Sequence, residues 1–239
     1  MSQDHNWKLV WNSKAAQIQK DDLLNSLIKA NGFDTGCGDY SSAQWQLMTL
    51  ELSKILNITK DSKVIEIGCG SGALLHAIQI HSQAKIFGYD YSASLISSAN
   101  QFLNGEFKVS EALINPFDYI KFDFAISHSV FQYFPDQDYA IKTIQTMANS
   151  LVPGGKIALL DLNDAACENI YHEDRRKNYK DPSTYDEKYK NHPHLFYSKD
   201  VIKNALIKFG FTDISFPQHS VAEYINSKFR FNIIGTKIA

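Results

Sequence analysis

Residues 64–73, VIEIGCGSGA, constrain the fold more than any other segment of the chain. A short apolar run ends at Gly68, glycines turn the chain, and a helix-forming stretch follows directly. Gly68 permits the tight turn, Gly70 lets a ligand approach the backbone closely, and the helix N-terminus offers free N–H groups. A strand, glycine turn and helix in this order suit a nucleotide cofactor bound at the carboxyl ends of parallel strands.

Strands and helices alternate from residue 63 onward. Apolar runs predict strands at residues 64–68, 85–90, 106–109, 122–127 and 156–162, and helices lie between them at 71–81, 92–102 and 136–151. This alternation implies right-handed crossovers and a doubly wound α/β domain with a parallel sheet. The end of the chain differs. A helix over 198–209 is followed by two strand-like runs, 211–216 and 229–238, which predict an antiparallel hairpin at the sheet edge.

Two further segments flank or interrupt this pattern. Residues 1–60 predict helices, including one over 43–56, joined by the glycine-containing segment 31–42. Residues 163–197 form a polar, tyrosine-rich insert, and a loop of this length is generally functional or mobile. We therefore divide the chain into an N-terminal helical cap, residues 1–60, and a cofactor-binding domain, residues 61–239, with the insert 163–197 as a substrate lid.

Charge and cysteine content exclude several classes of protein. The 24 Lys and Arg against 26 Asp and Glu give a formal charge of −2, which does not suggest a nucleic-acid partner. Cys37, Cys69 and Cys167 form no CxxC pair, so a disulfide framework or zinc knuckle is not expected. No apolar run has signal-peptide length or the roughly 18 residues of a membrane span. We expect a cytoplasmic protein without a membrane partner; its oligomeric state stays open.

The glycine motif by itself allows two cofactors. Gly68, Gly70 and Ala73 fit the dinucleotide pattern GxGxxG/A, and Asp90 lies where a ribose-binding carboxylate is expected. An NAD(P)-dependent oxidoreductase is therefore the alternative. Glu66 argues against it, because a carboxylate beside the loop would repel a diphosphate but suits the ammonium and sulfonium of S-adenosylmethionine. The competing interpretation of Glu66 is a partly exposed strand residue paired to a lysine.

Taken together, the motifs resemble the class I S-adenosylmethionine-dependent methyltransferases over most of residues 60–238. The similar segments are EIGCGSG (66–72), YDYS (89–92), VSEA (109–112), FDFAISHSVFQYF (122–134), LVPGGKIAL (151–159) and FRFNIIGTK (229–237). The strand at 106–109 is more polar than is usual, and Glu111 stands where many members have aspartate. The resemblance implies a seven-stranded mixed sheet with a terminal antiparallel strand.

The resemblance also implies a set of S-adenosylmethionine-binding residues. Asp90 would accept hydrogen bonds from both ribose hydroxyls, although it could instead cap the next helix, a role that Ser92 also offers. Tyr91 would pack on the adenine, and Tyr40 would reach the cofactor from the N-terminal segment; each is alternatively an ordinary aromatic residue. The full set is Tyr40, Glu66, Gly68, Cys69, Gly70, Gly72, Asp90, Tyr91, Glu111, Ala112 and Ser127.

The acceptor is the least constrained part of the prediction. No basic stripe runs along the chain, and SHSV stands where related enzymes that methylate flipped bases or amides have NPPY. We therefore expect a small organic acceptor, with a non-catalytic S-adenosylmethionine-binding module as another alternative. His194 is the first candidate for a general base and His128 the second, although both could be structural. His192 and His194 are too few ligands for a metal site, so no metal is expected.

Overall fold

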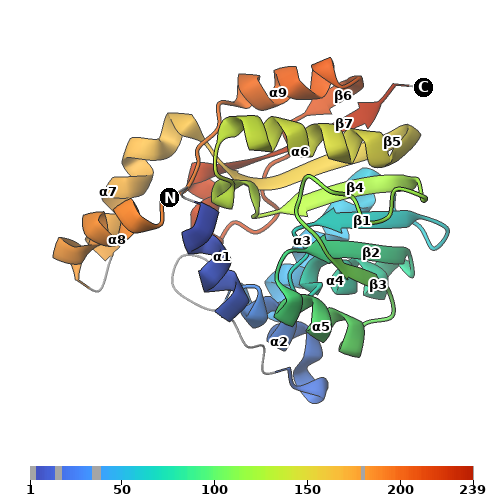
Figure 1. Cartoon of the computed structure of the whole chain (residues 1–239), viewed down its shortest axis with the longest axis horizontal. Coiled ribbons are helices and arrows are strands. Elements are labelled where there is room, and N and C mark those ends of the chain that lie inside the picture. The colour runs from blue at the N-terminus through green and yellow to red at the C-terminus, as the bar shows by residue number, and fades with distance from the viewer. Residues whose placement is uncertain (1–3, 14–17, 34–38, 179–180, 239) are drawn as a thin grey trace.

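The computed structural model describes residues 4–13, 18–33, 39–178 and 181–238. A twisted sheet with strand order β3-β2-β1-β4-β5-β7-β6 forms the centre, and helices cover both of its faces (Figure 1). Strand β7 runs antiparallel to both of its neighbours, whereas β1 to β5 are parallel. The predicted seven-stranded mixed sheet is therefore confirmed. Its strands are β1 (Lys63–Ile67), β2 (Lys85–Asp90), β3 (Glu106–Val109), β4 (Phe122–His128), β5 (Leu151–Asn163), β6 (Phe211–Ser215) and β7 (Arg230–Lys237).

The strand order reverses beside β1, which lies between β2 and β4. The connecting helices are α4 (Ala73–Ser82), α5 (Ala93–Phe102), α6 (Gln137–Ser150) and α9 (Lys199–Lys208). One apolar cluster joins the sheet to α4, and a second cluster on the opposite face joins it to α6 and α9. A reversal of this kind leaves a crevice at the carboxyl ends of the strands, where ligands bind in open α/β sheets.

The closing strands form the predicted antiparallel pair at the edge of the sheet. Within this pair, β6 is the edge strand and β7 lies between β5 and β6. The connection between them contains the 3₁₀ turn η6 (Ile225–Phe229). Burial explains the order, because β7 buries Phe231, Ile233 and Ile234, whereas β6 buries only its first residue, Phe211. The more apolar strand takes the interior position.

The N-terminal segment packs directly onto the sheet. It contains α1 (Asp4–Ser13), η1 (Lys20–Asp22), α2 (Leu23–Ala30) and α3 (Ser42–Leu56). Leu27 and Ile28 on α2 are fully buried in the cluster that contains Val64 and Leu74. Ser41 and Gln44 form a reciprocal capping box that begins α3. Gly36, Cys37 and Gly38 lie outside the described residues, and the division of the chain at residue 60 stays a prediction.

The insert after β5 is helical, which corrects the expected loop. Its elements are η4 (Ala165–Cys167), α7 (Glu168–Asn178), η5 (Pro182–Thr184) and α8 (Tyr185–Asn191), which project from one end of the sheet (Figure 1). The tyrosines pack inward: Tyr171, Tyr185 and Tyr197 are buried, and the Tyr185 hydroxyl lies 2.8 Å from His172 Nδ1. Aromatic packing thus supplies the core that an apolar stripe provides in the other helices. None of the helices described is long and apolar enough to cross a membrane.

Candidate active site

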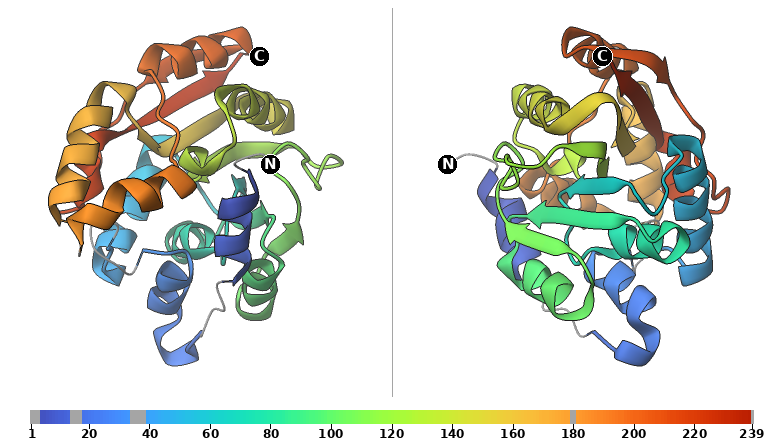
Figure 2. Two further views of the ribbon diagram at one scale, coloured as in Figure 1. Left: turned by 60° about the vertical axis from the view of Figure 1, so that its left-hand side comes forward. Right: turned by 90° about the vertical axis from the view of Figure 1, so that its right-hand side faces the viewer.

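A cleft opens at the carboxyl ends of β1, β2 and β4, where ligands bind in open α/β sheets. Trp7, Lys8 and Trp11 on α1 line one side of it. Figure 2 shows α1 between the insert and α5, so that the N-terminal helix covers the crevice predicted by the strand order. Of the residues predicted to bind the cofactor, the cleft lining contains Glu66, Gly68, Gly70, Asp90, Tyr91, Glu111 and Ala112.

Glu66 faces the cleft from the middle of β1 although it is almost fully buried. Its Oε2 atom has no hydrogen-bond partner, and it forms no ion pair with a lysine among the described residues. Burial, and to a lesser degree the charge of Asp90, raise the pKa of Glu66 well above its usual value. The raised pKa favours the neutral acid in this position, and a cation beside Glu66 would stabilise its ionised form. The ammonium and sulfonium of S-adenosylmethionine supply such a charge.

Asp90 ends β2 and joins the glycine loop to α5. Its Oδ2 accepts a hydrogen bond of 3.0 Å from the Gly70 N–H, and its Oδ1 accepts one of 2.8 Å from the Ser92 N–H. The Ser92 hydroxyl makes no capping bond and instead donates to the Trp11 carbonyl at 3.2 Å. Burial raises the pKa of Asp90, while the backbone N–H groups oppose that shift. Each carboxylate oxygen can accept a further bond, and ribose binding at Asp90 stays a prediction.

Replacing Asp90 with alanine is expected to weaken S-adenosylmethionine binding by about 1.5–3 kcal/mol, the range for hydrogen bonds to a charged group. The loss combines the ribose contacts with the orientation of the Gly70 N–H. Isothermal titration calorimetry measures the change, and circular dichroism checks that the variant is folded. Asp123, which is partly exposed, accepts a bond from the Lys63 N–H at the opposite end of β1, so Asp123→Ala is a matched control that should bind normally. Unchanged affinity in Asp90→Ala would remove Asp90 from the site.

Asn31, which follows α2, clamps the glycine loop, and the sequence reasoning missed it. Its Oδ1 accepts bonds from the Ser71 N–H at 2.8 Å and the Ser71 hydroxyl at 2.9 Å. Its Nδ2 donates to the Cys69 carbonyl at 3.3 Å. The partners lie about 40 residues apart along the chain, and no local pattern marks the contact. The cofactor loop is therefore completed by the N-terminal segment.

Three predicted residues lie together at the β2–β3 end of the cleft. Glu111 pairs with Lys8 of α1 at 2.8 Å, and the Lys8 Nζ also lies 5.9 Å from the centre of the Tyr91 ring. The Ala112 carbonyl accepts a bond from the Tyr89 hydroxyl at 3.2 Å, which fixes the backbone of this segment. An acidic residue and an aromatic ring thus flank the end of the cleft expected to hold the adenine.

Four predicted cofactor residues do not line the cleft. Cys69 Sγ packs where a Gly88 side chain would lie, and a Cβ on Gly72 would meet Leu103. The Ser127 hydroxyl donates to the Ile67 carbonyl at 3.0 Å. The Tyr40 ring packs 4.3 Å from that of Tyr224, and burial raises its pKa. Successive side chains along β4 point to opposite faces of the sheet, which explains why Ser127 does not line the cleft. Contacts of these residues with the cofactor stay predictions.

The two histidines proposed as bases occupy different positions. His128 lines the cleft and stacks on Phe33 at 5.4 Å, and burial lowers its pKa to about 4. His194 is not among the lining residues. Its ring stacks on Trp7 at 5.1 Å and its Nδ1 lies 3.3 Å from the Tyr171 hydroxyl, while burial lowers its pKa to about 3. Both histidines are neutral near pH 7, and their low pKa values make them weak bases. The hypothesis that one of them acts as the general base stays a prediction.

The low pKa of His128 predicts a loss of stability in acid. Between pH about 6.5 and 4 the unfolded chain binds a proton at this residue that the folded chain does not, so the free energy of unfolding falls as the pH falls. The full shift corresponds to about 3 kcal/mol. Urea denaturation across this range should show a shallower pH dependence for His128→Gln than for the unaltered chain. His81→Gln, at an exposed position, is the control and should keep the original slope.

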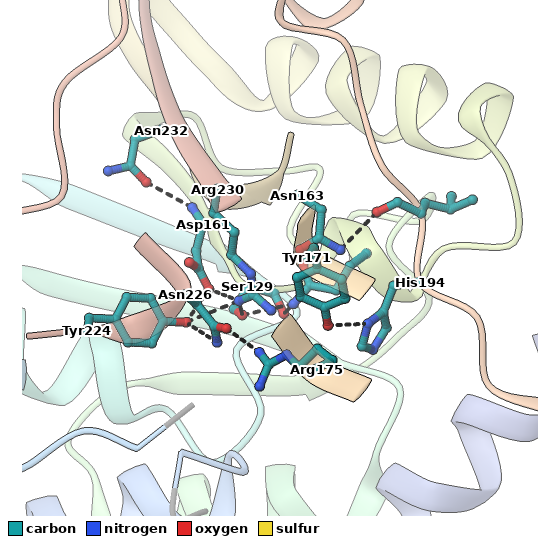
Figure 3. A network of polar contacts seen from close by, with 12 residues as sticks. Ser129, Asp161, Asn163, Tyr171, Arg175, His194, Tyr224, Asn226, Arg230 and Asn232 are labelled. Carbon is teal, nitrogen blue, oxygen red and sulfur yellow. Dashed lines mark hydrogen bonds and ion pairs between the residues drawn. The ribbon is translucent and has the colours of Figure 1, made fainter. Parts of the chain in front are cut away.

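A buried polar network lies behind the cleft wall, and the sequence reasoning missed it as well (Figure 3). Asp161 on β5 forms an ion pair with Arg230 at the start of β7, and both side chains are at most 6% exposed. Tyr224 donates to Asp161 Oδ2 at 2.9 Å, and Arg230 donates to the Ser129 hydroxyl at 3.2 Å. Burial opposes ionisation of Asp161, but the charge of Arg230 holds its pKa below the usual value. Ser129 lines the cleft, so this network extends to the surface of the cleft.

Metal ligands do not cluster in the described part of the chain. No group of three or more His, Cys, Asp or Glu side chains there is arranged to hold a metal ion. His192 instead packs its ring 5.2 Å from that of Trp7.

The fold and the carboxylate-lined cleft define a class I methyltransferase that uses S-adenosylmethionine as methyl donor. A family model described as "Methyltransferase domain" matches residues 40–215, and the chain belongs to this family. The solved N-methyltransferase NodS of Bradyrhizobium japonicum, in complex with S-adenosyl-L-homocysteine, has the same fold. The similarity has a TM-score of 0.61 at 17% identity and covers 97% of each chain.

Several curated relatives carry tRNA in their names. The human protein "Probable tRNA methyltransferase 9B" is 29% identical over 200 residues, which cover 76% of this chain and 41% of the relative. The "tRNA (carboxymethyluridine(34)-5-O)-methyltransferase" of Schizosaccharomyces pombe is 28% identical over 92 residues, which cover 38% of each protein. The matches thus span less than half of these relatives' lengths.

These relatives contradict the expectation that the chain has no nucleic-acid partner. That expectation rested on the net charge of −2 and the lack of a basic stripe. Net charge sums over the whole surface, whereas a protein can recognise an unpaired base through stacking and edge contacts at one site. The inference from bulk charge was therefore wrong, and a small organic acceptor is not confirmed.

Proposed function

We propose that the chain transfers the methyl group of S-adenosylmethionine to an unpaired base of an RNA. The observation that carries this proposal is the set of aromatic rings that line the cleft beside α1. Trp7 and Trp11 lie with their ring centres 4.8 Å and 5.4 Å from that of Tyr133, and all three residues line the cleft. Unpaired bases stack on such rings in RNA-binding proteins, and each stacked base contributes about 1–3 kcal/mol. The names of the two relatives support the same acceptor.

Contacts between α1 and the insert support a covering role for both segments. The Trp7 indole N–H donates to the Pro193 carbonyl at 3.0 Å, and Trp7 stacks on His194. On the other side, Lys8 pairs with Glu111 at the cleft rim. In this proposal α1 and the insert 163–197 close over the acceptor and exclude water, which favours methyl transfer over side reactions.

The test measures transfer of label from [methyl-³H]S-adenosylmethionine to three substrates: total tRNA, free nucleosides and a metabolite extract. Label in tRNA is expected, and Trp7→Ala and Trp11→Ala should reduce it at least tenfold, the effect of losing about 1.4 kcal/mol of stacking. Leu9→Ala, at an exposed position of the same helix, is the control and should retain activity. Label confined to the metabolite extract would contradict the RNA proposal and identify a small organic acceptor.

A further inference from the structure

The cleft has an excess of acidic over basic side chains. Glu66, Asp90 and Glu111 line it. Lys8 is the only Lys or Arg among the described residues of the lining, and its ammonium pairs with Glu111 at 2.8 Å. Burial raises the pKa values of Glu66 and Asp90, and a positive charge beside them would favour their ionised forms. The charges of the cleft therefore favour a bound cation and disfavour an anionic acceptor.

The two histidines that could accept a proton from an acceptor are enclosed. His128 is 6% exposed, and its ring lies 5.4 Å from that of Phe33 and 5.3 Å from that of Trp45. His194 is not among the lining residues, and its Nδ1 lies 3.3 Å from the Tyr171 hydroxyl. Burial also lowers the pKa of both histidines, so they bind a proton weakly. An acceptor that must lose a proton, such as a hydroxyl or an ammonium, meets no strong base at these positions.

The carboxyl groups of the lining already have other partners or roles. Both oxygens of Asp90 accept bonds from backbone N–H groups, and Glu111 is paired with Lys8. Glu66 faces the positive charge of the methyl donor in the proposed site, and a proton on Glu66 would remove that interaction. An acceptor that needs no deprotonation is therefore the one that suits this cleft.

Aromatic rings line the cleft where α1 meets the 3₁₀ turn η3 (Phe131–Tyr133). The ring centres of Trp7 and Trp11 lie 4.8 Å and 5.4 Å from that of Tyr133. Burial raises the pKa of Tyr133, so its phenol stays protonated at neutral pH and does not act as a base. The faces of such rings attract cations, most strongly where water is excluded. These rings can therefore stabilise a positive charge on a stacked base as well as the stack itself.

We propose that the methylated atom is a neutral ring nitrogen of the RNA base, of the pyridine type found at N1 of adenine, N3 of cytosine and N7 of guanine. This inference rests on the proposed methyl transfer to RNA and names the acceptor atom. Such a nitrogen has a lone pair without losing a proton. The N–CH₃ bond forms as the S–CH₃ bond breaks, and the sulfonium sulfur takes the electron pair of that bond. The products are the thioether S-adenosylhomocysteine and a positively charged base, which the rings and carboxylates stabilise.

The experiment determines the charge of the labelled nucleoside. Total tRNA labelled from [methyl-³H]S-adenosylmethionine is digested with nuclease and phosphatase, and the nucleosides are passed over a cation exchanger at mildly acidic pH. Unmodified nucleosides are uncharged under this condition and pass through. The label should be retained, and should elute with one of the cationic standards 1-methyladenosine, 3-methylcytidine and 7-methylguanosine.

Variants of Trp11 test whether the rings stabilise the charge. Trp11→Leu keeps an apolar side chain but removes the ring face, and should lower kcat by about 2- to 30-fold, the range for a cation–π contact. Trp11→Phe should restore part of this loss. An effect on kcat separates charge stabilisation in the transition state from stacking of the neutral base, whose loss raises KM. Leu9→Ala, at an exposed position of the same helix, should match the unaltered chain. Calorimetry with S-adenosylmethionine checks that each variant keeps its cofactor site.

Each outcome bears separately on the two proposals. Label in a cationic nucleoside supports both. Label in an uncharged nucleoside, on a carbon, an exocyclic nitrogen or a ribose oxygen, would overturn the ring-nitrogen inference and leave the RNA acceptor in place. Label confined to the metabolite extract would contradict the RNA acceptor and the inference that rests on it. Equal kcat for Trp11→Leu and Leu9→Ala would contradict charge stabilisation by the rings.

Discussion

Replacing Gly70 with valine is expected to abolish S-adenosylmethionine binding. The residue has φ +53°, which a β-branched side chain rarely adopts, and a Cβ there would lie 2.4 Å from Asn31 Oδ1. Asn31 would have to move, which would break its bonds to Ser71 and Cys69 and free the loop that Asp90 also holds. Calorimetry should detect no binding at concentrations that saturate the unaltered chain.

Gly210→Val provides the matched control for this result. Gly210 also has a positive φ, of +82°, but a Cβ there would meet no atom within 4 Å. The substitution should cost about 1–2 kcal/mol of stability through backbone strain and leave cofactor binding intact. Normal binding by Gly70→Val would show that the glycine loop is not the cofactor site.

Replacing Asp161 with asparagine is expected to lower the free energy of unfolding by about 3–5 kcal/mol, since it leaves the Arg230 charge buried without its partner. Both side chains are nearly inaccessible, so water cannot compensate for the lost ion pair. Urea denaturation at pH 7 measures the effect. The double variant Asp161→Asn/Arg230→Met removes both charges, keeps a residue that tolerates the φ of 63° at position 161, and should recover most of the loss. A loss below about 1 kcal/mol in Asp161→Asn would mean that the pair behaves like one at the surface.

Short motifs and apolar runs in the sequence predicted most of the strands of the parallel sheet. The glycine motif placed β1 and α4, and apolar runs placed β2, β4 and β5 within a few residues, apart from the early start of β5 at Leu151. The insert helices escaped detection because they carry no apolar stripe; in α7 only Tyr171 is buried. The closing antiparallel pair was predicted, but which of its two strands forms the edge depends on burial and not on the order along the chain.

The candidate site also contains both kinds of residue: some are marked by a local sequence pattern, and others have partners far away in the sequence. Glu66 and Asp90 were recognisable because a charged residue interrupted or ended an apolar strand beside glycines. Asn31 binds Ser71 across 40 residues, and Asp161 binds Arg230 across 69, so no motif contains both partners. A charged residue within each apolar run, Asp161 in KIALLDL and Arg230 in FRFNIIG, was the available signal. Charges of opposite sign in two buried strands predict a pair, although not which strands are adjacent.

The position of α1 has a kinetic consequence for turnover. The helix covers the cleft through contacts of modest strength: the partly exposed Lys8–Glu111 pair, the Trp7–Pro193 bond and the Ser92–Trp11 bond. An exposed ion pair contributes about 0–1 kcal/mol and weakens in salt. We therefore expect α1 to move away from the cleft before S-adenosylhomocysteine leaves. If this opening is slower than methyl transfer, it sets the residence time of the product and the turnover rate.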